Sequence, residues 1–149
     1  MTTPTSAIML KVEPDTLQQT KLGTISGRIY LQSPTGGFPA LGWTDLIIPV
    51  LCAWLSAIRT VAGGGKKQVV HFMDGPYYVE LNPRPQGMIS LLLIEDRANA
   101  GRQELSAASD MLLRNASEAA DLLLSKCRKL GWDNSDLDQL NRLRQGISY

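Results

Sequence analysis

Histidine is the scarcest reactive side chain in this 149-residue chain: His71 is the only one, and Cys52 and Cys127 are the only cysteines. A nucleophile–histidine–acid arrangement needs three side chains within reach of one another, and a zinc site needs closely spaced ligands. One histidine and two distant cysteines offer neither pattern. We therefore predict no metal site, no cofactor and no enzymatic activity.

An excess of charge of one sign is also missing. Fifteen basic side chains stand against 14 acidic ones, which leaves a formal net charge of +1. Proteins that bind nucleic acid usually carry a basic excess or a basic stripe. We therefore expect no nucleic-acid partner.

Long hydrophobic runs are absent as well. The longest, residues 46–55, is about half as long as a membrane-spanning helix. No basic stretch followed by an apolar one opens the chain, so we predict no signal peptide. The two unclustered cysteines fit a reducing compartment, although a disulfide between them is an alternative. We expect a cytoplasmic protein without membrane contact.

The chain has the composition of a globular protein, with 44% hydrophobic and 19% charged residues, rather than that of a disordered one. One domain of this size buries about 70% of its unfolded surface and folds without a disulfide or a metal. We predict a single α+β domain over residues 1–149 that is monomeric when free. Residues 1–6 are expected to be disordered, and 133–149 to form a short helix and tail.

Hydrophobic alternation predicts an antiparallel sheet of about five strands. Pro14 and Asp15 are expected to end the first strand. The last strand shows little alternation, so we place it at the centre of the sheet. The predicted strands are residues 7–13, 23–31, 67–73, 77–82 and 88–94.

Three helices are predicted. Trp43-Thr44-Asp45 has the character of a helix start, but Pro49 favours a helix that begins there and ends before the glycines at 63–65. That helix is apolar almost all round, so it should be buried, as an insertion between strands two and three. Residues 105–130 form a long amphipathic helix packed on one face of the sheet. Ser135 starts the last helix.

A tight corner lies within residues 69–81. Two apolar runs flank Asp74-Gly75-Pro76, which is a turn signal, so the segment is typical of two paired antiparallel strands. The corner places Asp74, Tyr77 and Tyr78 close to His71. Tyrosine is over-represented at binding hot spots because its rigid ring contributes contact area at low entropic cost.

Two stretches of sequence suggest a family. The chain reads Phe-Pro-x-x-Gly-Trp-Thr-Asp over residues 38–45 and Phe-Met-Asp-Gly-Pro-Tyr over 72–77, with an apolar helix through Trp54 between them. This order resembles bacterial immunity proteins encoded beside polymorphic toxins. The resemblance implies a protein that binds and neutralises a cognate toxin in the producing cell. The residues expected to contact the toxin are Asp74, Tyr77, Tyr78 and Glu80, then Trp43 and Asp45.

Three alternatives stay open at this point. The corner around Asp74 could be structural, in which case replacing Asp74 would lower stability rather than affinity. A small enzyme could be built from His71, Asp74 and Cys52. The apolar and amphipathic helices could instead serve a chaperone or adaptor that loads a secreted effector.

Overall fold

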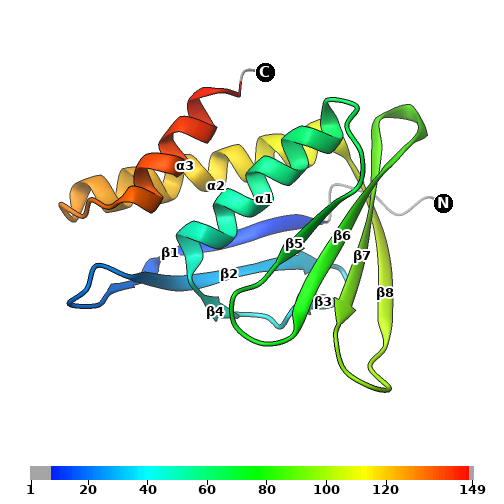
Figure 1. Cartoon of the computed structure of the whole chain (residues 1–149), viewed down its shortest axis with the longest axis horizontal. Coiled ribbons are helices and arrows are strands. Elements are labelled where there is room, and N and C mark those ends of the chain that lie inside the picture. The colour runs from blue at the N-terminus through cyan, green and yellow to red at the C-terminus, as the bar shows by residue number, and fades with distance from the viewer. Residues whose placement is uncertain (1–7, 148–149) are drawn as a thin grey trace.

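The computed structural model describes residues 8–147. The prediction that residues 1–6 are disordered lies outside this range. Within it the chain is α+β, as predicted, but the strands form two antiparallel sheets of four strands each rather than one sheet of about five (Figure 1). The elements are β1 Met9–Gln19, β2 Ile25–Ser33, β3 Gly36–Phe38, β4 Thr44–Asp45, α1 Ile47–Ala62, β5 Gln68–His71, β6 Tyr77–Arg84, β7 Met88–Glu95, β8 Arg102–Ala108, α2 Ser109–Lys129 and α3 Ser135–Gln145.

The first sheet is built around β2. Strand β1 pairs with one edge of β2, and the short strands β3 and β4 both pair with the other. Pro14 does not end β1, contrary to expectation. The pairing with β2 is irregular between Glu13 and Gln18, and the Thr16 side chain links the two strands across this interval. The Thr16 hydroxyl donates to Glu13 O (2.7 Å) and accepts from Arg28 N (2.9 Å), in place of ladder hydrogen bonds.

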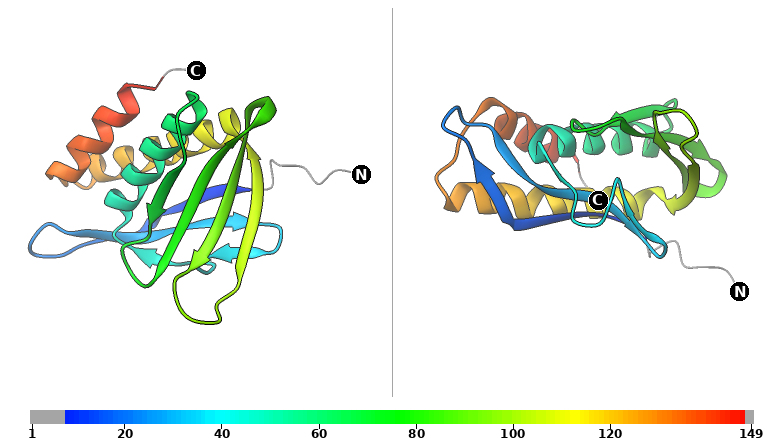
Figure 2. Two further views of the ribbon diagram at one scale, coloured as in Figure 1. Left: turned by 45° about the vertical axis from the view of Figure 1, so that its right-hand side comes forward. Right: turned by 90° about the horizontal axis from the view of Figure 1, so that it is seen from below.

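The second sheet has the order β5-β6-β7-β8. Strand β7 is an interior strand, as its continuous apolar run predicts. The paired residues Val79 and Leu93 point to the face that α1 covers, whereas His71 and Tyr78, also paired, point to the opposite face. Helix α1 covers one side of this sheet (Figure 2), whereas α2, which was predicted to cover the sheet, packs mainly on β1 of the first sheet and on α1.

Helix α1 is the centre of the core. Ten of its 16 residues are buried, and it contacts both sheets and both other helices. It begins at Ile47, before Pro49, because a proline in the first turn removes only an N–H that has no partner within the helix. Within residues 8–147, no helix is both long and apolar enough to cross a membrane.

The predicted helix over residues 105–130 is wrong at its start. Residues 102–108 form β8, in which Leu105 pairs with Leu91, and α2 begins only at Ser109. Leu105 and Ala108 fit a helical spacing, while Leu105 and Ala107 fit strand alternation equally well. Residues 102–108 form a strand because the backbone groups of β7 on that edge need hydrogen-bond partners, which a strand supplies and a helix does not. Helix α3 begins at Ser135 as predicted, although its cap is Asn134, whose Oδ1 accepts from Leu137 N (2.8 Å).

One residue on the free edge of β1 has its backbone groups paired by a side chain. Asn115 on α2 accepts from Leu10 N (2.6 Å) and donates to Leu10 O (3.1 Å). Its amide group therefore does what a neighbouring strand would do at that position. An open strand edge is a template for pairing with other chains, so this contact protects the sheet as well as fastening α2 to it.

Replacing Asn115 with Ala should lower the free energy of unfolding by about 1–3 kcal/mol, because two backbone groups of a half-covered edge lose their partners. Urea denaturation followed by circular dichroism measures the loss. Asn141→Ala on α3 is the matched control, since the Asn141 amide makes no hydrogen bond within residues 8–147. Equal stability losses in the two variants would contradict this role of Asn115.

Candidate partner-binding site

The two family-like stretches, which are far apart in sequence, meet in one aromatic cluster. The Phe38 ring lies 6.0 Å from that of Phe72 and 5.7 Å from that of Tyr77. Trp43 lies 5.2 Å from Tyr77, and the buried Trp54 lies 6.2 Å from Phe72. All four pairs are edge-to-face, the arrangement that ring quadrupoles favour. The cluster joins the first sheet, α1 and the β5–β6 turn.

Asp45 ties the same segments together through hydrogen bonds. Its side chain is buried, with 4% of the residue exposed. Oδ2 accepts from Trp43 Nε1 (3.0 Å) and from the backbone N–H of Asp74 (3.2 Å), while Oδ1 accepts from Leu46 N (2.7 Å). Thr44 and Asp45 form β4 rather than the predicted helix start. Asp45 therefore holds the β5–β6 turn against the first sheet.

The β5–β6 turn, residues 72–76, is held at both of its ends. Phe72 N donates to Tyr77 O (3.0 Å), and Asp96 N donates to Pro76 O (2.7 Å). Gly75 has a φ of +76°, and a Cβ there would lie 2.8 Å from a Tyr77 ring carbon. Glycine is required at this position by both its backbone conformation and the closeness of the ring. The turn is thus held by backbone hydrogen bonds at both ends and by the packing of Gly75 against Tyr77.

The six predicted contact residues fall in three places. Trp43, Asp45 and Tyr77 lie beneath the turn, where it meets the first sheet; we call this contact the joint. The Tyr77 hydroxyl there lies 3.4 Å from Glu95 Oε1. The Asp74 side chain is exposed on the turn, and its carboxylate has no partner in the described part of the chain. Strand alternation places the remaining two, Tyr78 and Glu80, on the outer face of β6.

That outer face carries His71 as well. The rings of His71 and Tyr78 lie 5.2 Å apart, and Glu80 Oε1 lies 3.8 Å from Lys67 Nζ. Both contacts are on the surface, where an ion pair contributes little to stability. The predicted corner is therefore split, with Asp74 on the turn and Tyr78 on the side of the sheet away from α1.

A hollow of about 350 Å³ opens beside the turn. Met73, which sequence analysis did not select, lines it and is 58% exposed, although it is a large apolar side chain. The sequence did contain a signal for this exposure. Met73 lies between the end of β5 and the Asp-Gly-Pro turn, where no strand exists to turn its side chain toward the core. The lining is Ser26, Thr44, Asp45, Leu46, Met73 and Asp74.

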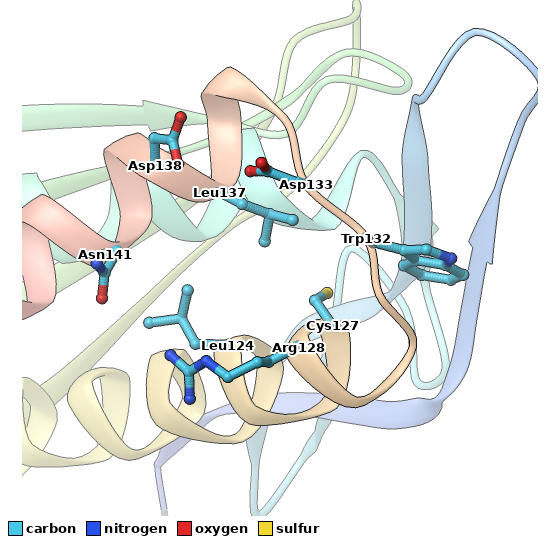
Figure 3. Close-up of a pocket in the computed structure, with 8 residues that line it drawn as sticks. All are labelled: Leu124, Cys127, Arg128, Trp132, Asp133, Leu137, Asp138 and Asn141. Atoms are coloured by element: carbon cyan, nitrogen blue, oxygen red, sulfur yellow. The ribbon is translucent and has the colours of Figure 1, made fainter.

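A second hollow, of about 230 Å³, lies between α2 and α3 (Figure 3). Leu124 and Leu137 extend from the two helices into the space between them, and Cys127 lies at its inner side. Its walls carry one guanidinium and two carboxylates, so a ligand in it would meet charges of both signs. The lining is Leu124, Cys127, Arg128, Trp132, Asp133, Leu137, Asp138 and Asn141.

The residues of the enzyme alternative do not come together. Cys52 faces α3, where its Sγ lies 3.9 Å from Asp136 O, and burial raises the pKa of its thiol to about 11. His71 is exposed on the far side of the second sheet, and Asp74 lies on the turn. Both cysteines are free and buried, so the alternative of a disulfide between them is not seen. The described residues contain no cluster of three or more potential metal ligands.

Comparison with known proteins adds no relative: no family model, curated protein or solved structure matches the chain.

We expect Gly75→Ala to destabilise the protein more than Gly64→Ala does. Both glycines have a positive φ, which costs about 1–2 kcal/mol for alanine, but open space surrounds Gly64. Only the Gly75 variant also pushes against the Tyr77 ring, which adds about 1 kcal/mol or more. Thermal and urea unfolding of the two variants measures the difference, and equal losses would show that the turn yields freely.

Asp45→Asn should lower the free energy of unfolding by about 2–3 kcal/mol, because an amide cannot accept from all three donors and sets its own N–H₂ against one of them. Asp74→Asn should change it by less than about 0.5 kcal/mol, as is usual for exposed positions. Urea denaturation of the pair separates the buried carboxylate from the exposed one. A large loss for Asp74→Asn would mean that its side chain is structural.

Proposed function

We propose that this protein is an immunity-type protein, which binds a cognate protein toxin in the cytoplasm of the producing cell and neutralises it. The observation that carries the proposal is the β5–β6 turn, which is fastened at both ends and to Asp45. The stretches that resemble immunity proteins fold against each other, and this packing leaves Met73 and Asp74 exposed on the protein surface. A binding protein of this kind needs a complementary surface rather than a catalytic group.

The contact surface that we propose consists of two parts. The turn surface is Met73, Asp74 and Thr44, all exposed. The sheet surface is His71, Tyr78 and Glu80 on the outer face of β5 and β6. Trp43, Asp45 and Tyr77 support the turn surface from below, since their polar groups are engaged within the chain. Pre-organisation of this kind reduces the entropy lost on binding and so raises affinity.

An exposed methionine beside an exposed carboxylate suits a protein partner. The thioether chain adapts to an irregular apolar surface, and an unpaired carboxylate favours a cationic group on the partner. The apolar faces that motivated the adaptor alternative are used inside the fold, because α1 lies between the two sheets and the other helices. We therefore prefer toxin binding to effector loading.

Co-expression with the product of the adjacent open reading frame tests the proposal. We expect growth rescue, a complex that co-purifies, and loss of the partner's activity in that complex. A stable complex in which the partner stays active would favour a chaperone. No rescue and no complex would refute the immunity function.

Met73→Ser should weaken that complex about tenfold, because an apolar contact at the centre of the proposed surface is lost. Leu22→Ser is the matched control, since Leu22 is an exposed apolar residue (95%) at the tip of the β1–β2 connection. Isothermal titration calorimetry measures both affinities, and unchanged melting temperatures exclude unfolding. Equal affinities of the two variants would place the contact elsewhere.

A further inference from the structure

Two carboxylates line the hollow beside the β5–β6 turn, and neither forms an ion pair within the described residues. Asp45 and Asp74 both line it. Asp45 accepts from three neutral donors, and among residues 8–147 no lysine or arginine pairs with either carboxylate. A buried carboxylate acts through a medium of low dielectric constant, so its charge is weakly screened at the wall of the hollow.

The other walls of the hollow are suited to a long side chain. Leu46 and Met73 are apolar side chains of the lining, and Ser26 and Thr44 also line it, with hydroxyls that make no hydrogen bond in the described structure. The volume of about 350 Å³ far exceeds the roughly 10–15 Å³ that one water occupies on the same measure. The exposed Asp74 carboxylate and these two hydroxyls are acceptors for a ligand's N–H groups, whereas both Asp45 oxygens are already engaged.

We propose that this hollow receives an arginine side chain of the partner protein. The stem of the arginine would lie against Met73 and Leu46, and its guanidinium would donate to the Asp74 carboxylate and the neighbouring hydroxyls. Arginine suits the hollow better than lysine because its planar group is weakly hydrated and offers five donors, including a bidentate pair for a carboxylate. This inference rests on the proposed function, whose partner would supply the arginine.

The test uses the full-length protein and a small probe, N-acetyl-arginine amide, followed by ¹H–¹⁵N correlation spectra. We expect saturable shifts of the Met73, Asp74 and Thr44 amides with a dissociation constant on the order of 1–10 mM, as suits a ligand of so few atoms. N-acetyl-citrulline amide, which has nearly the same shape without the charge, should bind about fivefold more weakly or not at all.

Asp74→Asn should weaken binding of the arginine probe about fivefold and leave the spectrum otherwise native. Asp133→Asn, which removes an exposed carboxylate from the other hollow, should leave the affinity unchanged. Equal binding of citrulline amide or leucine amide, or shifts spread over the whole surface, would overturn the inference.

The inference and the proposed function can fail separately. If the probe binds in the hollow but the neighbouring gene product is not neutralised, the arginine site stands without the immunity function. If the toxin is neutralised and neither Asp74→Asn nor the arginine probe affects the complex, the immunity function stands and the arginine site is refuted.

Discussion

The buried carboxylate of Asp45 is the contact on which the arrangement of the proposed site depends. It accepts two hydrogen bonds from its own stretch of chain, from Trp43 Nε1 and Leu46 N, and one from the backbone N–H of Asp74 in the β5–β6 turn, 29 positions away. Apolar contacts are non-directional, so they could hold the two sheets together without fixing the angle of the turn. The hydrogen bond from Asp74 N to the buried carboxylate is directional, and the two local bonds hold that carboxylate in place, so together they favour one position of the turn.

The aromatic cluster and the hydrogen bonds of Asp45 have different structural roles. Phe38, Phe72 and Tyr77 fill the seam between the sheets, while the carboxylate selects one position of the turn within that seam. At the start of β8, Gln103 Nε2 donates to Thr35 Oγ1 (2.9 Å), a second polar contact between the two sheets. The surface that we propose for a partner thus belongs to a joint between sheets rather than to a free loop.

Sequence reasoning predicted the elements with a strong periodic signal and missed those defined by their neighbours. The strands around Val79 and Leu91 and the helix through Trp54 follow from local apolar patterns. Strands β3 and β4 are too short to show a pattern, and β8 shares its apolar spacing with a helix. Among the candidate contact residues, the exposure of Asp74 could be predicted from its turn, whereas the burial of Asp45 depends on a backbone N–H 29 positions away, which no local pattern contains.

The contact between Asn115 and Leu10 has a consequence for how the chain is made. The two residues are 105 positions apart, so during synthesis the edge of β1 stays open until most of the chain has left the ribosome. Strand pairing between β1 and β2 can form early, because it is local, yet its outer backbone groups are then available to any other strand. Until α2 has been synthesised, the Leu10 backbone groups lack the partner that they have in the folded protein.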